Sequence, residues 1–214
     1  MSGETRTPES FADPFVARAA PRGPAGPSRG GGRTPGETGI WVFAFGDLLV
    51  FTVFFCVFVH ERARAPEAFE LGRRSLDLTF GTLNTLLLLT GSLSVVLGLH
   101  ALRRGATRPG TRALLVTLVC GAGFVIDKYL EYAGAVQAGH TPSANAFFMY
   151  YFVLTGIHLV HLLIGMAGLG LMYRIARTPS PGPREIRLLE AGGCYWHLVD
   201  LLWIILFALL YLMR

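Results

Sequence analysis

The sequence contains little charge and only one lysine. Of its 214 residues, 15% are charged and 52% are hydrophobic, whereas soluble domains carry about 25% charged residues. This composition excludes an ordinary soluble domain and indicates a membrane protein of a single domain. Because Lys128 is the only lysine, the formal charge of +5 comes from arginines in the N-terminal tail and between apolar runs. A nucleic-acid-binding protein would gather them on one folded face, so no nucleic acid is expected as a partner.

Cysteine is also scarce, and its three copies are far apart. Cys56, Cys120 and Cys194 lie in three different apolar segments, and no CxxC pair is present. This spacing suggests neither a zinc site nor a disulfide framework. We therefore expect each cysteine to be a small buried hydrophobic residue.

The first 39 residues lack any apolar run but hold six prolines and eight glycines. Such a composition cannot bury enough surface to offset the entropy of ordering. Residues 1–39 are therefore expected to form a disordered tail, and residues 40–214 a membrane domain.

Five apolar stretches follow the tail, at residues 40–59, 78–99, 113–135, 147–173 and 191–213. Each reaches the roughly 20 residues that a helix needs to cross a hydrocarbon core about 30 Å thick. Helices are expected because the backbone must satisfy its own hydrogen bonds in lipid. The sequence thus predicts an all-α, polytopic membrane protein with a bundle of five transmembrane helices.

Arginines in the short connections predict the orientation of the bundle. The second and fourth connections each carry four arginines: Arg103, Arg104, Arg108, Arg112, Arg174, Arg177, Arg184 and Arg187. The third connection, residues 134–145, has none. We therefore expect a bacterial cytoplasmic membrane protein with a cytoplasmic N-terminus and an external C-terminus. The first connection, residues 61–77, conflicts with this orientation because it carries four arginines, although four acidic residues balance them locally.

Several ionisable side chains lie inside the apolar stretches, where each costs about 2.5–3.5 kcal/mol on insertion scales. Asp47 has no basic neighbour on its own stretch, so a functional role and a packing role are both open. Lys128 and Glu131 are three residues apart and can pair on one helix face, which leaves Asp127 less obviously satisfied. These side chains are candidates for a polar network inside the bundle.

The last stretch carries a polar stripe of Glu190, His197 and Asp200, at nearly whole helical turns. It is interpreted either as a proton relay or polar seam against a partner, or as a hydrogen-bonded clamp between helices. His158 and His161 are three residues apart and face roughly the same way. Two such histidines can bind a metal or haem, but each is more often satisfied by its neighbours, and the Glu and His pattern of a di-iron bundle is missing.

The last stretch also carries the most specific motif of the chain. Residues 190–203 read EAGGCYWHLVDLLW, and this sequence resembles the signature of the haem-copper oxidase subunit III family. Three further segments agree in order: Leu83-Asn84-Thr85, Glu131-Tyr132, and TGIHLVH at residues 155–161. The resemblance extends from about residue 39 to the end and is to the short, five-helix form. Gly46-Asp47 stands where oxidase subunits usually carry glutamate, and this pair resembles the NorE-type accessory branch associated with nitric oxide reductase.

The resemblance implies a non-catalytic subunit that binds no haem or copper itself. It implies packing against catalytic subunit I, which would carry the haem and copper, together with structural phospholipid and support of proton uptake in aerobic electron transport. By position, Asp47 corresponds to the buried carboxylate of the family. The other matching positions, expected to form polar networks or subunit and lipid contacts, are Asn84, Glu131, His158, His161, Glu190, Trp196, His197 and Asp200.

Three alternatives stay open. Within the family, the chain can be a NorE-type accessory protein of nitric oxide reductase. In a different class, it can be a haem-binding cytochrome b membrane anchor. A small transporter is disfavoured because the sequence shows neither repeated halves nor a pair of broken helices.

Overall fold

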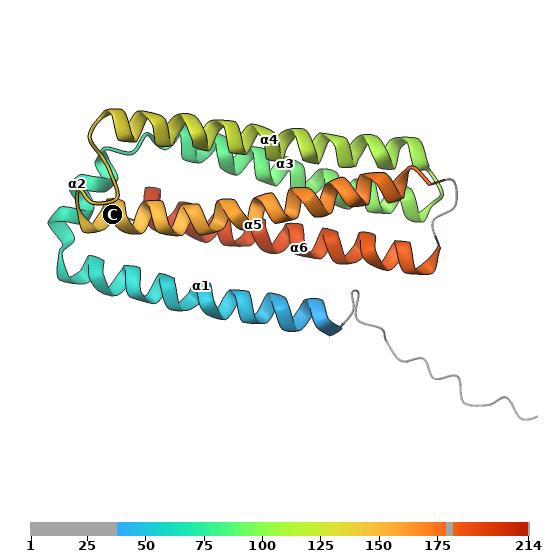
Figure 1. Ribbon diagram of the computed structural model, residues 1–214, viewed down its shortest axis with the longest axis horizontal. Coiled ribbons are helices and arrows are strands. Elements are labelled where there is room, and N and C mark those ends of the chain that lie inside the picture. Colours follow the sequence, from blue (N-terminus) through green and yellow to red (C-terminus); the bar gives the residue numbers. More distant parts are fainter. Residues whose placement is uncertain (1–37, 179–181, 214) are drawn as a thin grey trace, which may run out of the picture. The chain divides into compact units, whose positions relative to one another are not determined.

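The computed structural model describes residues 38–178 and 182–213, and these residues are almost entirely helical (Figure 1). Their elements are α1 (Thr38–Arg64), α2 (Pro66–Arg74), α3 (Leu78–Arg103), α4 (Thr107–Gln137), α5 (Ala146–Ala176), α6 (Pro183–Phe207) and the short π-helix η1 (Ala208–Leu212). All of the α-helices except α2 are long and apolar enough to cross a membrane. The predicted all-helical chain with five spanning helices is therefore confirmed. The expected disordered tail lies outside the described residues, except for its last two positions, which begin α1.

Local sequence signals define where the helices begin and end. Asp77 and Asn145 cap the N-termini of α3 and α5, because their side chains accept hydrogen bonds from the backbone N–H groups of Thr79 and Phe148. Gly105 and Gly139, with φ of 74° and 80°, follow the ends of α3 and α4. Only glycine adopts this left-handed conformation at little cost, so these two residues end the helices with sharp turns.

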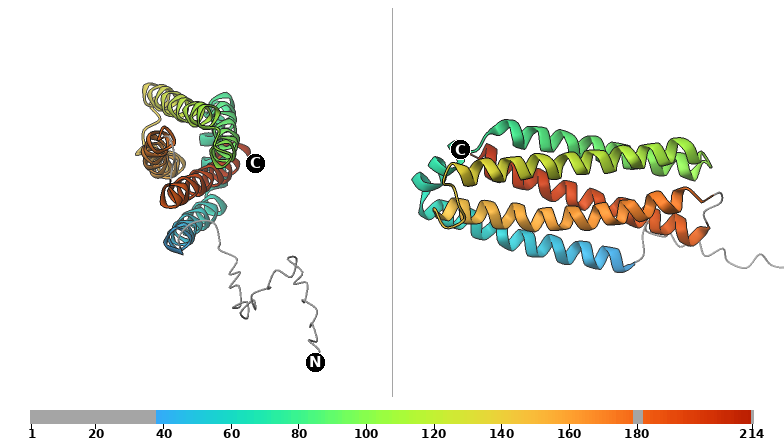
Figure 2. Two further views of the ribbon diagram at one scale, coloured as in Figure 1. Left: turned by 90° about the vertical axis from the view of Figure 1, so that its right-hand side faces the viewer. Right: turned by 45° about the horizontal axis from the view of Figure 1, so that its top comes forward.

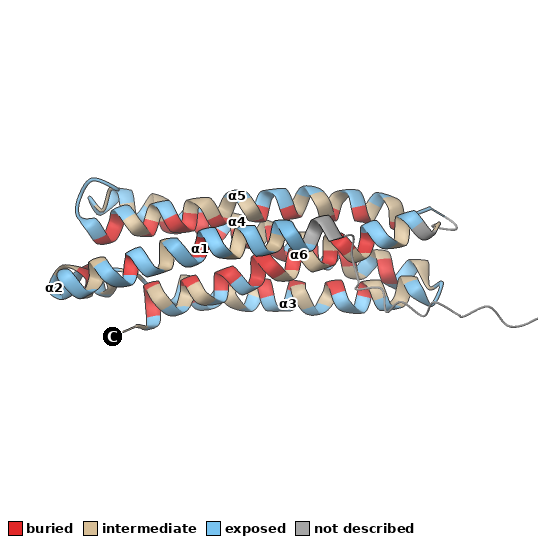
Figure 3. Cartoon of the chain, turned by 90° about the horizontal axis from the view of Figure 1, so that it is seen from below, coloured by how far each residue is buried: buried red, intermediate tan, exposed pale blue. Residues whose placement is uncertain are grey.

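Helix α6 lies at the centre of the bundle, and α1 lies at its edge. The end-on view in Figure 2 shows α6 beside α1, α3 and α5, with α4 completing the other side. Half of the most apolar window of the last span is buried inside the protein, compared with 11% of that of α1. Buried positions accordingly follow the inner faces of the helices in Figure 3, while the outer faces stay exposed. Those outer faces are rich in leucine and valine, as expected of a surface that contacts lipid.

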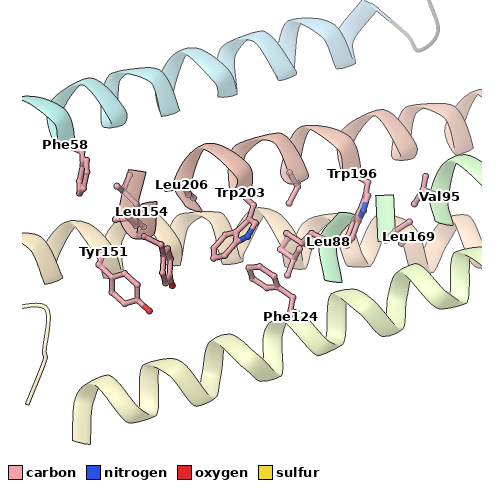
Figure 4. Close-up of a cluster of buried hydrophobic side chains, with 14 of the residues drawn as sticks. Phe58, Leu88, Val95, Phe124, Tyr151, Leu154, Leu169, Trp196, Trp203 and Leu206 are labelled. Carbon is pink, nitrogen blue, oxygen red and sulfur yellow. The ribbon is translucent and has the colours of Figure 1, made fainter. Parts of the chain in front are cut away.

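Aromatic rings fill the interior between α4, α5 and α6 (Figure 4). Trp203 and Phe124 meet edge to face with ring centroids 4.7 Å apart, which is a favourable arrangement for aromatic pairs. Trp203 also donates its indole N–H to Thr85 Oγ1 at 3.1 Å. Trp196, Trp203 and Tyr151 are completely buried, so the signature sequence of α6 supplies much of the core.

The first connection contains an additional helix, α2, that the hydropathy pattern did not predict. Phe69 and Gly72 are buried on one face of α2. On the other side, Glu70 accepts hydrogen bonds from Arg73 at 2.7 and 3.0 Å and from Arg74 at 3.0 Å. These bonds, chiefly those from Arg73, lower the pKa of Glu70 to about 2. Two arginines of this connection thus share one carboxylate, which balances one of their two charges.

The prediction that all three cysteines are buried is wrong for Cys56. Cys120 is buried and Cys194 is half-buried, whereas Cys56 is exposed on α1. Inside a membrane the surroundings of the bundle are themselves apolar, so a small hydrophobic side chain gains little from moving inward.

Candidate functional site

The polar side chains predicted from the sequence fall into three groups on different helix contacts. The first group joins α1 to α5. His161 Nε2 lies 3.0 Å from Asp47 Oδ1, and both side chains are mostly buried. Tyr195 of α6 adds a hydrogen bond to the backbone carbonyl of His161 at 3.2 Å. Asp47, which lacks a basic neighbour on its own helix, therefore has a partner 114 residues away in the sequence.

The geometry of His161 indicates how protons are arranged in this pair. Its Nδ1 lies 2.8 Å from the carbonyl oxygen of Ile157, and a carbonyl oxygen only accepts hydrogen bonds, so Nδ1 carries a proton. The Nε2 atom then shares one further proton with Asp47, as an acid and imidazole or as a carboxylate and imidazolium. Both arrangements are electrically neutral overall, which suits a site of low dielectric constant.

The second group joins α4 to the C-terminal segment η1. Lys128, fully buried, donates to Glu131 Oε2 at 2.6 Å and to Tyr211 OH at 3.2 Å. Tyr211 in turn donates to Glu131 Oε1 at 2.5 Å. The expected pairing of Lys128 with Glu131 is thus present, and Tyr211 closes a triangle of hydrogen bonds around it.

Aromatic rings surround the buried ammonium group. The Nζ atom of Lys128 lies 4.8 Å from the ring centroid of Trp203 and 5.4 Å from that of Tyr151, within the range of cation–π attraction. Tyr132 continues the group toward α5 by a 2.6 Å hydrogen bond between its hydroxyl and that of Thr155. The rings and the carboxylate together replace the water that the ammonium group loses on burial.

The third group lies in the contact between α3 and α6. At the end of α3, Arg103 donates to Glu190 at 2.7 Å. Deeper in the bundle, Ser92 Oγ lies 2.5 Å from His197 Nδ1. Asp200 is only 5% exposed, and neither of its carboxylate oxygens has a hydrogen-bond partner among the described residues. Glu190 and His197 thus bond to α3, as a clamp between helices requires, whereas Asp200 does not.

Three further predicted residues are buried without polar partners. Asn84, His158 and Trp196 have no exposed surface, and no described residue hydrogen-bonds to their side chains. Asn84 lies near Asp127, which has one oxygen without a partner. These residues fill the core, and their predicted part in a polar network or in subunit and lipid contacts stays a prediction.

His158 and His161, three residues apart on α5, contact different helices. His158 contacts Phe124 and Trp203, with ring centroids 5.7 and 5.2 Å away, whereas His161 turns to Asp47 on α1. The ring of His158 packs among aromatic side chains of α4 and α6, and that of His161 bonds to α1, so they do not form a shared pair of ligands. Across the two described ranges, no three His, Cys, Asp or Glu side chains gather closely enough to bind a metal ion.

Several partners of these groups were not among the predicted site residues. Ser92, Tyr195 and Tyr211 each complete a hydrogen bond to a predicted residue. A serine or tyrosine in an apolar helix is common and carries no charge, so hydropathy and motif spacing give no signal for it. Tyr211 lies in the π-helical turn η1 at the end of α6. Such turns are rare in proteins, and those that occur are often found at functional sites.

Comparison with known proteins agrees with this architecture. Residues 34–214 match the family of cytochrome c oxidase subunit III. The chain is 28% identical to the quinol oxidase subunit 3 of Bacillus subtilis and 30% identical to the cytochrome c oxidase subunit 3 of Alkalihalophilus pseudofirmus; each match covers 82% of this chain and 85% of the relative. It is also 27% identical to the haem-copper oxidase subunit I+III of Aeropyrum pernix, over 82% of this chain and 22% of that protein. The chain therefore belongs to the cytochrome c oxidase subunit III family.

Proposed function

We propose that this chain is the non-catalytic subunit III of a haem-copper terminal oxidase, bound to the catalytic subunit I in a bacterial cytoplasmic membrane. The observation that carries the proposal is the family match, which covers every described residue. The relative from Aeropyrum pernix supports the choice of partner, because its name places subunits I and III in one protein. In this role the chain stabilises the complex and supports proton uptake, and the haem and copper belong to the partner.

The remaining alternatives have less support. The relatives named above are oxidase subunits, and none of them favours the NorE-type accessory protein of nitric oxide reductase that the Gly46-Asp47 pair resembles. A cytochrome b anchor needs facing histidines for its haem. Here His158 is enclosed by aromatic rings and His161 is committed to Asp47.

The orientation that we propose has a cytoplasmic N-terminus and an external C-terminus. The arginines of the second and fourth connections support it. The first connection is compatible with an external position, since Glu70 pairs with Arg73 and Arg74, and Glu61 lies 3.7 Å from Arg64.

Purification through a tag on the C-terminus tests the proposed partner. From the membranes of the native host, we expect the tagged chain to bring down subunit I together with its haem absorbance. The chain produced without its partner should be colourless. A Soret band in the chain alone, or recovery of nitric oxide reductase in place of an oxidase, would contradict the proposal.

An apolar groove between α1, α5 and α6 supports the proposal that the subunit holds phospholipid. The groove has a volume of about 390 Å³ and is lined by aliphatic and aromatic side chains, among them Phe43, Ile164 and Leu198. It opens to the side of the bundle, where acyl chains surround a membrane protein. We infer that an acyl chain fills it. Tyr195 lines the groove and also bonds to the backbone of His161, so it links the groove to the Asp47 pair.

Substitution Asp47→Asn tests the role of the buried pair in the assembled oxidase. The amide has the shape of the acid and can still donate to His161 Nε2, so stability should change by less than about 1.5 kcal/mol, the scale of one hydrogen bond. The shared proton is lost, and we expect a shorter lifetime of turnover or less retained phospholipid, measured as activity over many cycles and lipid phosphorus per complex. Asp47→Glu restores the acid and serves as the control. Failure of assembly in Asp47→Asn, or unchanged turnover and lipid content, would refute the special role of this carboxylate.

A further inference from the structure

Asp200 is the one member of the polar stripe on α6 that the clamp between helices does not explain. The residue is 5% exposed and lies in the middle of the last span, and its carboxylate has no hydrogen-bond partner among the described residues. Among the described residues, the hydroxyl of Ser92 lies near this carboxylate, and the ion pairs of the bundle do not include Asp200. A buried carboxyl group without a cation or a donor is stable only in its neutral form, so Asp200 carries a proton.

A route connects this proton to the edge of the membrane. A groove of about 270 Å³ runs along the contact of α3 and α6, and its polar lining comes from His100, Arg103, Glu190 and His197. Water occupies about 30 Å³ per molecule in the liquid, so the groove has room for several. Glu190 lies near the start of the span, and Asp200 is about 15 Å deeper at 1.5 Å per residue. His197 stands between them, half-buried at the groove.

Ser92 completes the route because it lies between His197 and Asp200. Its hydroxyl lies 2.5 Å from His197 Nδ1 and next to Asp200. A serine hydroxyl donates one hydrogen bond and accepts others, so a small rotation lets it bond to either neighbour. His197, Ser92 and Asp200 therefore form a continuous row of hydrogen-bonding side chains from the groove to the buried carboxyl group.

We propose that Asp200, Ser92 and His197 form a proton-holding site that exchanges its proton with water in the groove between α3 and α6. During release, the Asp200 O–H bond breaks as its proton passes to Ser92 Oγ. The original hydroxyl proton of Ser92 passes to His197 Nδ1, and the imidazolium then loses its Nε2 proton to water. Loading follows the same steps in reverse, and no oxidant or other reactant is needed.

The test is infrared spectroscopy of the full chain in phospholipid vesicles, followed after transfer to heavy water. At neutral pH we expect a protonated carboxyl band that Asp200→Asn removes. Its deuterium exchange should be slower by about tenfold or more in Ser92→Ala and in His197→Gln, because positioned donors and acceptors accelerate proton transfer by about 10²- to 10⁴-fold. Glutamine keeps a hydrogen bond to Ser92 but does not titrate.

Ser94→Ala is the matched control. Ser94 lies on the same helix, is half-buried, and points away from the groove two residues further along α3. In Ser94→Ala, the carboxyl band of Asp200 should exchange at the same rate as in the unmodified chain. The proposal is overturned if no infrared band depends on Asp200. It is also overturned if this band exchanges equally fast in Ser92→Ala, His197→Gln and Ser94→Ala, since opening of the whole bundle would then be the route of exchange. Neither result bears on which oxidase the chain joins.

Discussion

Replacing Lys128 by methionine is expected to lower the free energy of unfolding of the bundle by about 3–5 kcal/mol, the usual cost of removing one partner of a buried ion pair. Methionine keeps the length of the side chain but leaves the Glu131 carboxylate with Tyr211 as its remaining donor. The loss should be measured as the shift of the denaturation midpoint in detergent micelles, followed by circular dichroism.

The size of this effect separates two physical causes. A single hydrogen bond between membrane helices contributes about 0.6 kcal/mol on average, so Tyr211→Phe should cost far less than Lys128→Met. If the orphaned charge is the cause, the double variant Lys128→Met with Glu131→Gln should recover much of the stability. A double variant no more stable than Lys128→Met would show that lost packing is responsible. A Lys128→Met chain as stable as the unmodified one would contradict the buried pair itself.

The second large effect is expected from Gly72→Ala in α2. A Cβ atom at this position would lie 2.6 Å from Phe147 Cγ and 2.9 Å from Phe147 Cβ. Phe147 is buried against Phe69 and Phe148, with ring centroids 5.9 and 5.4 Å away, so it has little room to move. Overpacking of a core typically costs about 1–3 kcal/mol, more than the gain of about 1 kcal/mol in helix propensity.

Gly156→Ala in α5 is the control, because a Cβ atom there meets nothing within 4 Å. This variant should be as stable as the unmodified chain or gain up to about 1 kcal/mol. Both variants are compared by thermal denaturation in the same detergent. If both glycines tolerate alanine equally, the close contact between α2 and α5 is not a constraint on the fold.

The spanning helices follow from the sequence because their cause is local. A run of about 20 apolar residues has no stable state in the membrane other than a helix. The third span shows the limit of this reasoning. Its apolar pattern becomes weak at Asp127, yet α4 continues to Gln137 because Lys128 and Glu131 neutralise each other inside the bundle. Helix α2 is only nine residues long, so a search for long apolar runs does not detect it.

The polar contacts likewise divide into one that a single helix determines and others that require the packed bundle. The Lys128–Glu131 pair follows from a spacing of three residues on one helix, and it is present at 2.6 Å. The contacts of Asp47 with His161 and of His197 with Ser92 join residues more than 100 positions apart. They depend on the depth and rotation of two helices, which no single segment encodes. That rotation also decides that His158 contacts α4 and α6 while His161 contacts α1.

The sequence alone therefore determined the class of the protein, the number of its membrane spans, and the family that its last helix resembles. Each of these is a property of a single segment in contact with lipid, or of a short motif. The tertiary structure decided which acids are paired, that Tyr211 completes the Lys128 group, and that Asp200 has no hydrogen-bond partner among the described residues. The physical reason is that side chains find partners across helices only after close packing has set how each helix is turned.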